Sequence, residues 1–198
     1  MKNNDVGKSE VSLIAEPAVL GLIGLAVAAL VLGSTDLGFT SSVSKSLMIP
    51  WVLFFGATAQ LIAGLMEFKR TNIFGATVFT VYAMTMYSIA VTLVISIFTG
   101  ASFDITHYGY GLIGIFIFSM IATVASLLTN KVFFAILIAV DLAVVLLVPH
   151  YLFGFSPWYA GIFLLVTSAL SFYGAAAILL NTMAKKIVLP LGNPLWKR

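Results

Sequence analysis

The sequence predicts an all-α integral membrane protein with six transmembrane helices in each protomer. Three observations lead to this prediction. Of the 198 residues, 61% are apolar and 9% are charged, with a mean hydropathy of +1.12, whereas soluble domains carry about 25% charged residues. Six apolar stretches are long enough to cross a hydrocarbon core about 30 Å thick as helices. The alternating strands of about ten residues that are typical of a membrane barrel are absent from the sequence.

The six spans follow one another closely along the chain. The first stretch is short unless it continues toward Thr35, and the others reach spanning length as they stand. Because every connection is short, we expect a single domain with no soluble catalytic module. The expected spans are residues 17–32, 46–66, 73–98, 108–129, 132–153 and 157–183.

The breaks between the spans contain residues that end or begin helices. Glycine, proline, asparagine and serine interrupt helical patterns because of their backbone geometry or their side-chain hydrogen bonds. Charged residues gather in the break at residues 67–72. In order along the chain, the breaks are residues 33–36, 67–72, 99–102, 130–131 and 154–157.

The basic residues predict the orientation of the protein. In a six-span arrangement, Lys45 alone falls on one side and the other nine of the ten Lys and Arg residues fall on the opposite side. Loops rich in Lys and Arg stay in the cytoplasm. We therefore expect a multi-pass protein of the plasma membrane, with a cytoplasmic N-terminal tail (1–16), a six-helix domain (17–184) and a cytoplasmic C-terminal tail (185–198). The nine residues are Lys2, Lys8, Lys69, Arg70, Lys131, Lys185, Lys186, Lys197 and Arg198.

Composition excludes several classes of function. The chain has no cysteine, so disulfides, thiolate metal sites and iron–sulfur clusters are excluded. Two histidines and seven scattered acidic residues leave little for metal or acid–base chemistry, and we expect neither metal nor cofactor. No nucleophile and base occur at matched depth in the spans, so an enzyme is not expected. The basic residues do not form a face interleaved with aromatic residues, so no nucleic-acid partner is expected.

Few strongly polar residues fall at membrane depth. Glu16 and Glu67 lie near span ends, Gln60 lies within the second span, and Asp141 lies halfway along the fifth. Ionisable groups at such depth are candidates for function. Asp141 is either a titrating group in a transport path or a neutral or hydrogen-bonded group at a subunit interface, because an unpaired buried charge is costly; we favour the second. Glu16 and Asp141 are the candidate titrating groups.

Small and polar residues share one face of the second span. Gly56, Gln60, Ala63 and Glu67 are spaced so that they stack along a helix. Such a face either packs against another helix or forms one wall of a passage; we favour packing and leave the passage open. Similar faces are expected at Gly75, Phe79, Tyr82 and Met86 on the third span, and at Ser168, Ser171 and Ala175 on the sixth.

Residues 56–82 resemble the succinate/acetate permease family. Nearly every fixed position of the family pattern is met in this stretch, from Gly56 and Gln60 through Glu67 and Asn72 to Tyr82. Residues 16–22 stand where the family has its N-P-A-P-L-G-L signature, and residues 188–192 match its V-L-P-[IL]-G tail. Two departures are Glu16 in place of asparagine and Val19 in place of the second proline. An acid at a helix N-terminus, where anions are otherwise favoured, would alter anion selectivity or its pH dependence.

The resemblance implies a homohexamer in which each protomer has its own pathway for acetate or succinate. It also implies a hydrophobic constriction at Leu25, Tyr82 and Ile136, with Ser171 at a small pore-lining position. The family usually has phenylalanine in place of Leu25 and leucine in place of Ile136. Because leucine is smaller than phenylalanine, Leu25 would make the constriction wider and would admit a larger acid. The motif residues at the entrance are Glu16, Pro17, Gly21, Glu67 and Asn72.

A small carboxylate fits the polar residues of the spans. No Lys, Arg or His lies deep in a span, so binding would be weak, as conduction requires. Gln60, Thr80 and Thr85 are the candidate substrate-binding residues. We expect transport of acetate and related short carboxylates such as succinate, by proton-coupled symport or through an anion channel. The alternatives are a channel for a small neutral solute (ammonia, urea or an amide) and a six-span structural or interaction protein that does not transport.

Overall fold

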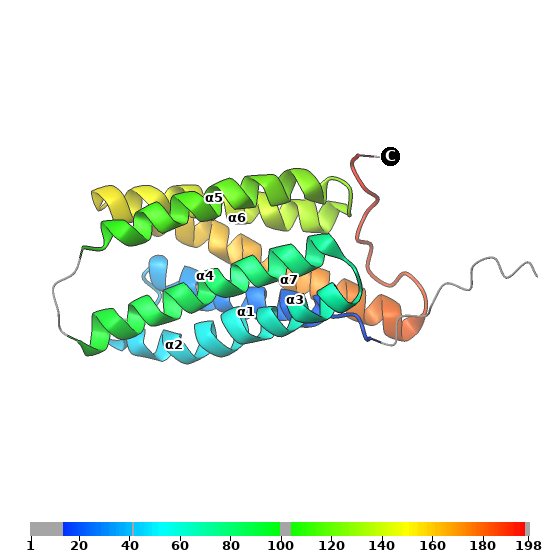
Figure 1. Cartoon of the computed structure of the whole chain (residues 1–198), viewed down its shortest axis with the longest axis horizontal. Helices are drawn as coiled ribbons and strands as arrows, with labels where there is room; N and C mark the ends of the chain where they lie inside the picture. The colour runs from blue at the N-terminus through cyan, green and yellow to red at the C-terminus, as the bar shows by residue number, and fades with distance from the viewer. Residues whose placement is uncertain (1–13, 41, 100–103, 197–198) are drawn as a thin grey trace, which may run out of the picture.

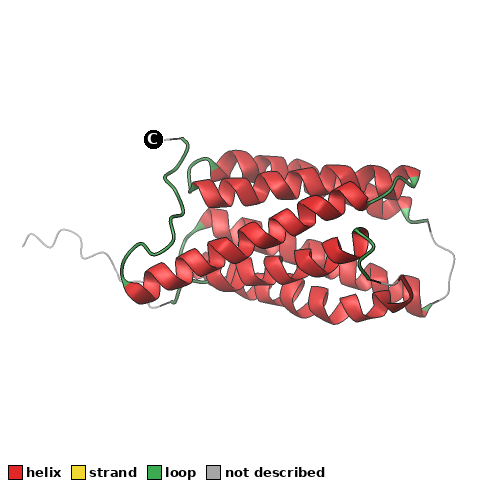
Figure 2. Cartoon of the chain, turned by 180° about the vertical axis from the view of Figure 1, so that it is seen from behind, coloured by secondary structure: helices red, strands yellow, loops and turns green. Residues whose placement is uncertain are grey.

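The computed structural model describes residues 14–40, 42–99 and 104–196, and the regular elements in these ranges are all helical (Figure 2). The described part of the chain has six helical segments that are long and apolar enough to cross a membrane. This confirms the predicted all-α class and the six spans. The first helix continues to Asp36, and this extension gives it the length that a membrane span needs. The segments are α1 (Ala18–Asp36), Lys45–Lys69, α4 (Ile73–Phe98), α5 (Thr106–Ser126), α6 (Lys131–Phe153) and α7 (Trp158–Ala184).

The second span is not a uniform α-helix. It passes from a 3-10 helix, η1 (Ser42–Leu47), through α2 (Met48–Trp51) and a π-helix, η2 (Val52–Ala59), to α3 (Gln60–Lys69). Within η2, the hydroxyl of Thr58 donates a hydrogen bond to the carbonyl of Leu53, five residues earlier, at 2.8 Å. π-Helices are rare and occur frequently at functional sites. The predicted small and polar face nevertheless stays together, because Gly56, Gln60, Ala63 and Glu67 are all buried.

Side-chain caps hold two of the predicted breaks. The side-chain Oδ1 of Asn72 accepts a hydrogen bond from the backbone N–H of Gly75 at the start of α4. In the same way, Oδ1 of Asn130 accepts a hydrogen bond from the backbone N–H of Phe133 at the start of α6. Gly154 ends α6 with a positive φ of 72°, a conformation that glycine adopts without steric cost. The fourth span ends at Ser126, three residues earlier than expected, because residues 127–129 form turns.

The helices form a ring around a central space. Going round, α4 packs on the second span, the second span on α1, α1 on α7, α7 on α6 and α6 on α5. The ring closes between α5 and α4, which approach each other at few positions. Figure 1 shows α5 and α6 as a pair that stands apart from α4. The α5–α6 pair is therefore held to the rest of the protein mainly through α7.

The positive charges separate to the two ends of the bundle, as predicted. Lys69 ends α3 and Arg70 follows it, Lys131 begins α6, and Lys185 and Lys186 follow α7. These positions share one end of the bundle (Figure 1), which we call the basic end. Lys45 lies at the opposite end, beside the C-terminus of α1. Four of the residues that were used to predict the orientation, Lys2, Lys8, Lys197 and Arg198, lie outside the described residues.

Candidate functional site

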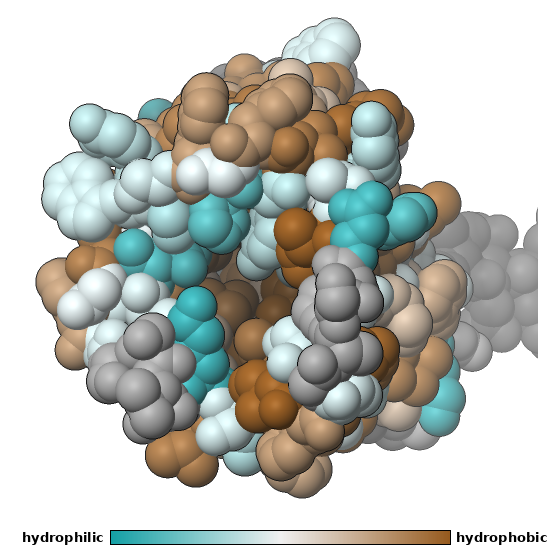
Figure 3. All heavy atoms as spheres, turned by 90° about the vertical axis from the view of Figure 1, so that its left-hand side faces the viewer, coloured by the Kyte–Doolittle hydropathy of each residue, from teal (hydrophilic) through white to brown (hydrophobic). Residues whose placement is uncertain are grey.

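A cavity of about 220 Å³ enters the bundle at the end opposite the basic end. We call it the Lys45 vestibule. Figure 3 shows a hollow at this end, with hydrophilic residues around it and hydrophobic residues at its bottom. Its residues come from α1, the start of the second span, α4, α5, α6 and α7, so it lies inside the ring. Leu25, Tyr82 and Val140 are among its lining residues.

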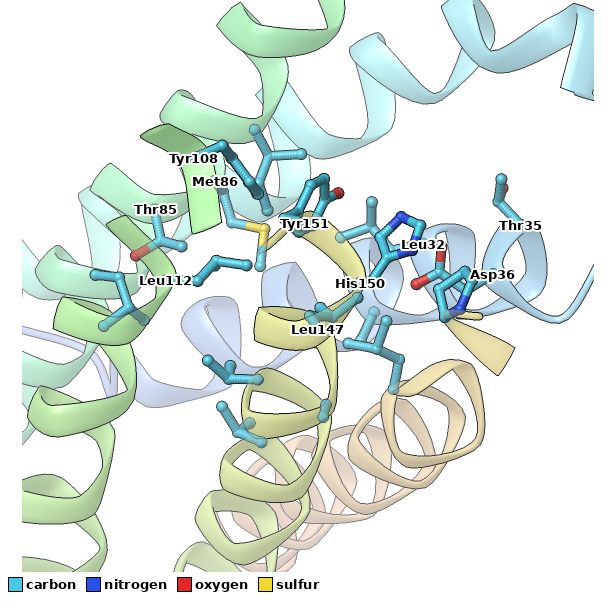
Figure 4. Close-up of a pocket in the computed structure, with 18 of the residues that line it drawn as sticks. Leu32, Thr35, Asp36, Thr85, Met86, Tyr108, Leu112, Leu147, His150 and Tyr151 are labelled. Carbon is cyan, nitrogen blue, oxygen red and sulfur yellow. The ribbon is translucent and has the colours of Figure 1, made fainter. Parts of the chain in front are cut away.

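Charged side chains line the same vestibule. Asp36, at the end of α1, interacts electrostatically with His150 and Lys45, and all three residues line the cavity. The imidazole Nδ1 of His150 lies 2.6 Å from the carbonyl oxygen of Phe155, which fixes the ring near the mouth. Figure 4 shows Asp36 and His150 close together, with Thr85, Met86 and Leu112 in another part of the cavity. The sequence analysis missed Asp36 and His150 because they lie at the ends of different spans, and only the ring arrangement brings these ends together.

A second cavity, of about 330 Å³, opens at the basic end. We call it the Glu67 vestibule. Glu16, Glu67 and Asn72, three of the five residues expected at the entrance, line it, together with Gly75 and Phe79. Residues far apart in the sequence therefore meet at one mouth. Thr129 and Asn130, from the turn between α5 and α6, and Leu191, from the tail after α7, complete its wall.

Glu67 is the most buried acid in this vestibule, with 1% of its surface exposed. Its Oε2 accepts a hydrogen bond from Asn72 Nδ2 at 3.0 Å, whereas its Oε1 has no hydrogen-bond partner among the described residues. A Cβ atom added to Gly75 would lie 2.9 Å from Glu67 Cδ. The contacts among Glu67, Asn72 and Gly75 therefore fix the turn between α3 and α4. They leave Glu67 Oε1 without a hydrogen bond to another described residue.

Glu16 has a charged partner at the same mouth. Its Oε2 lies 2.6 Å from Arg70 Nη1, and about a third of the Glu16 side chain (32%) is exposed. This ion pair connects the residues before α1 to the turn between α3 and α4. The acid that replaces the family's asparagine is thus paired with a neighbouring cation, which partly neutralises it. Pro17 stands at the start of α1, and the ring of Phe79 fills the space beside Gly21.

An apolar cluster separates the two vestibules. Leu25, Tyr82 and Ile136, the three residues expected at the constriction, belong to one buried cluster. Leu25 and Tyr82 line the Lys45 vestibule, and Phe79 of the same cluster lines the Glu67 vestibule. Leu22 is 1% exposed and Ile136 is 2% exposed, and both face the flat surface at Gly174 of α7. Leu22 and Phe79 were not expected at the constriction, although each lies one helical turn from a residue that was.

The expected polar residues separate into two groups. Thr85 lines the Lys45 vestibule, and its hydroxyl donates to the carbonyl of Val81 in its own helix. Ser171 is fully buried, and its hydroxyl has no hydrogen-bond partner among the described residues. Thr167, one turn earlier on α7, is also without such a partner and lines the Lys45 vestibule. Thr85 and Thr167 therefore line the Lys45 vestibule, whereas Ser171 is among the lining residues of neither vestibule.

Gln60 and Thr80 lie at contacts between helices. Gln60 is fully buried, donates from Nε2 to the carbonyl of Gly56 at 2.7 Å, and packs against Gly24 of α1. Thr80 donates to the carbonyl of Ala76, and its methyl group fills the space beside Gly64. Neither residue is among those that line the two vestibules. The small and polar face of the second span thus packs against α1 and α4 along most of its length.

Residues 3–193 match the GPR1/FUN34/yaaH family. The chain belongs to this family. The succinate-acetate/proton symporter SatP of Escherichia coli K12 is 27% identical over 191 residues, which cover 91% of this chain and 96% of SatP. Acetate permease A of Emericella nidulans is 29% identical over 153 residues, which cover 70% of this chain and 50% of the permease. The solved structure of the bacterial acetate channel SatP matches with a TM-score of 0.84 at 25% identity, over 90% of this chain and 99% of that one.

These similarities confirm the expected family and the six-helix fold. The GPR1/FUN34/yaaH match extends over nearly the whole chain, as the motifs at residues 16–22, 56–82 and 188–192 indicated. The curated relatives above are a symporter and a permease, and the matching structure is that of a channel. Together with the six apolar helices, the match identifies this family member as a multi-pass membrane protein.

One buried acid of this GPR1/FUN34/yaaH protein lies beside the constriction. Asp141 on α6 is 6% exposed, and its carboxylate accepts hydrogen bonds from Ser119 and, at 2.6 Å, from Thr123, both on α5. The Ser119 hydroxyl also bonds the hydroxyl of Tyr82 on α4 at 2.7 Å. Asp141 is therefore hydrogen-bonded within its own protomer. The sequence analysis favoured a neutral or hydrogen-bonded Asp141 at a subunit interface, and the hydrogen bonds agree with the first part of that interpretation.

Proposed function

We propose that the protein transports acetate and related short carboxylates, including succinate, across the plasma membrane through a pathway within each protomer. One observation carries the proposal most directly: two cavities open at opposite ends of the bundle, and an apolar cluster lies between them. The names of the SatP relatives and of acetate permease A support acetate and succinate as substrates.

The chemistry of the pathway suits a small amphipathic anion. At the constriction, Leu22, Leu25 and Ile136 offer aliphatic surface to the methyl group of acetate. A narrow apolar constriction also excludes hydrated inorganic ions, because water leaves it readily. The Thr167 hydroxyl, which lines the Lys45 vestibule and has no hydrogen-bond partner among the described residues, is the first candidate to donate to the carboxylate. Thr85 lines the same vestibule and would have to release the Val81 carbonyl to donate, and Ser171 lies one turn from Thr167 on α7. Because hydroxyl groups bind an anion less strongly than a buried cation would, the substrate leaves readily.

The proposed assembly and orientation follow from the family and the charge distribution. We place both termini in the cytoplasm, so that the basic end and the Glu67 vestibule face the cell interior, with the spanning domain at residues 17–184 and a tail at each end. We further propose a homohexamer whose protomers each contain one pathway. The exposed apolar side chains on the outside of the bundle, such as Phe54, Ile117 and Ile121, provide surface for lipid and for neighbouring protomers.

Uptake of labelled acetate by liposomes that contain the purified protein tests the proposal. We expect uptake that exceeds that of protein-free liposomes and that succinate inhibits. Ile136→Trp, which fills the constriction, should abolish it, while Ile138→Trp serves as the matched control because Ile138 lies two residues away on the outer face and is 38% exposed. Uptake equal to that of protein-free liposomes in the wild type would overturn the proposal.

The same liposomes separate the remaining mechanisms. Acetate uptake that stops when an uncoupler removes the proton gradient indicates symport, whereas uptake that follows only the acetate gradient indicates a channel. Uptake of ammonia or urea without acetate would favour a channel for neutral solutes. A protein that folds and assembles but moves none of these solutes would favour a structural or interaction role.

A further inference from the structure

We infer that Asp141 and Ser119 form, with Tyr82, a proton-carrying chain that controls whether the tyrosine at the constriction can donate a hydrogen bond to a carboxylate. The inference rests on the proposed function and adds two positioning residues to it. Three hydroxyl or carboxyl groups from three helices meet in sequence: Tyr82 on α4, Ser119 on α5 and Asp141 on α6. Tyr82 is the member of this chain that lines the Lys45 vestibule.

The direction of the hydrogen bonds depends on the charge of Asp141. An ionised carboxylate only accepts hydrogen bonds, so Ser119 donates to Asp141 Oδ1 and Thr123 donates to Oδ2. A serine hydroxyl has a single hydrogen, so Tyr82 must donate its own hydrogen to Ser119. In this state, the Tyr82 oxygen presents only lone pairs to the pathway, which repel a carboxylate.

A proton on Asp141 reverses the chain. The proton is delivered to the Tyr82 oxygen by a hydronium ion, which leaves as water, or by the acid form of the substrate, which leaves as the carboxylate. As the new O–H bond forms, the old Tyr82 hydrogen moves to Ser119 Oγ and the old Ser119 hydrogen moves to Asp141 Oδ1. Three O–H bonds break, one of them in the proton donor, and three form, so the single added proton neutralises Asp141. Each hydrogen bond now points from Asp141 toward Tyr82, and the hydrogen of Tyr82 is free to donate to a carboxylate at the constriction.

No other described ionisable side chain is placed to disturb this chain. Lys131 and His150 on α6 are ten and nine residues from Asp141, which is about 15 Å along a helix. On α7, which also packs against α6, the described ionisable groups are the hydroxyls of Tyr159 and Tyr173, and both side chains are exposed. The remaining ionisable groups of α5 and α4 are His107, Tyr108 and Tyr110, in the first turns of α5, and Tyr87, whose hydroxyl bonds Thr58.

The hydrogen-bonded chain of Tyr82, Ser119 and Asp141 lies where protonation of Asp141 can affect how the helices are joined. The ring is weakest between α4 and α5, and the Tyr82–Ser119 hydrogen bond crosses this contact. Protonation of Asp141 thus changes a bond that joins the α5–α6 pair to the helix that carries Tyr82. The buried acid acts on the substrate through two hydroxyl groups and never touches it.

The test uses the full chain in liposomes, with labelled acetate outside, a pH-sensitive dye inside, and uptake by protein-free liposomes subtracted at each pH. In the wild type, uptake should fall with rising pH by as much as about tenfold per pH unit where Asp141 loses its proton. Asp141→Asn, whose amide donates permanently to Ser119, and Ser119→Ala, which disconnects Tyr82, should both retain uptake at alkaline pH and lose most of this dependence. Ser126→Ala is the matched control, since Ser126 is equally buried on α5 but bonds only the backbone of Thr123.

A lower rate with an unchanged pH profile in both variants would show that Asp141 and Ser119 only support the fold, and would overturn the inference. An infrared measurement of the carboxylic-acid C=O band keeps the test independent of transport. The band should appear at acidic pH, be absent from Asp141→Asn and shift in Ser119→Ala. If the wild type moves no acetate, the proposed function fails, and the infrared band still decides whether the chain gains a proton; a band that does not respond to pH overturns the inference by itself.

Discussion

Gly75 stands where the turn between α3 and α4 brings a buried acid, its amide partner and a helix N-terminus together. Its backbone N–H is bound by Asn72, and Glu67 fills the space where a side chain would lie. Contacts of this kind give a physical reason for the fixed spacing of Glu67, Asn72 and Gly75 in the family motif. Glycine is required at position 75 because the side chains of Glu67 and Asn72 already fill the space that a Cβ atom would take.

Gly75→Ala should therefore destabilise the protein by about 1–3 kcal/mol, the usual cost of overpacking a tight site. Thermal unfolding in detergent measures the change. Gly114→Ala is the control, because the space around Gly114 is open in the protomer and alanine is favoured over glycine within helices. Equal stability of the two variants would contradict the packing described for Glu67.

The Glu16–Arg70 ion pair should contribute little to stability. Both side chains are partly exposed, and exposed pairs contribute about 0.2–1 kcal/mol. A double-mutant cycle with Glu16→Gln and Arg70→Gln, measured by thermal unfolding, should give a coupling energy in that range. A coupling energy of several kcal/mol would mean that the pair is desolvated in the assembled protein.

Sequence reasoning reached some of these residues and missed others for a physical reason. Leu25, Tyr82 and Ile136 were identified through the family resemblance and do meet in one cluster. Gln60 and Thr80 were proposed as substrate-binding because they are polar at membrane depth, and the structure places both at contacts between helices and not among the residues that line the two vestibules. Which side of a helix faces a cavity depends on neighbours that the sequence does not position.

At the scale of elements, the second span differs most from expectation. Its length and apolar character follow from composition, whereas the π-helix η2 depends on contacts with other helices. The Thr58 hydroxyl bonds both the Leu53 carbonyl within η2 and the Tyr87 hydroxyl on α4. An isolated sequence pattern with a period of 3.6 residues cannot indicate such a change of helical geometry.

Thr58→Val should destabilise the protein by about 1–2 kcal/mol, because it removes hydrogen bonds and leaves their partners unpaired. Ser96→Ala, in an exposed part of α4 where the hydroxyl bonds only its own helix, should change stability by less than about 0.5 kcal/mol. Thermal unfolding of both variants in the same detergent makes the comparison. Similar values would mean that the Thr58 hydroxyl is not a fixed point of η2.

At the scale of the whole molecule, the ring order of the helices determines which span ends share a vestibule. The number of spans and the separation of charge to the two ends could be predicted from hydropathy and basic residues. The ring order could not, because six connected helices can be arranged around a space in many ways with the same short loops. Asp36 and His150 therefore became visible as neighbours only in three dimensions.

The absence of cysteine allows a direct test of orientation. In intact cells, Lys45→Cys should react with a membrane-impermeant thiol reagent added outside, and Lys185→Cys should react only after the membrane is opened. The unmodified chain has no thiol and provides the background. The reverse pattern would place the basic end outside the cell.

The tail after α7 should be held in place mainly by one side chain. Asn181 donates to the Leu189 carbonyl and accepts from the N–H groups of Val188 and Leu189. In Asn181→Ala, hydrogen exchange of residues 188–192 should become faster while exchange in α7 stays slow. Exchange that is unchanged in the tail would mean that its other contacts, such as that of Tyr173 with the Pro190 carbonyl, are sufficient.

The same tail connects the order of synthesis to the completion of a mouth. The backbone of Leu191 bonds Val132 at the start of α6, and Trp196 bonds Leu127 in the turn after α5, so residues that leave the ribosome after all six helices form part of the Glu67 vestibule. In the proposed orientation, the α5–α6 turn is uncovered on the cytoplasmic side of the membrane, where translation takes place, while the chain is still growing. A nascent chain can thus insert its helices before this mouth acquires its final wall, and ribosomes stalled after α7 would carry a bundle that is fully threaded through the membrane but unfinished at one end.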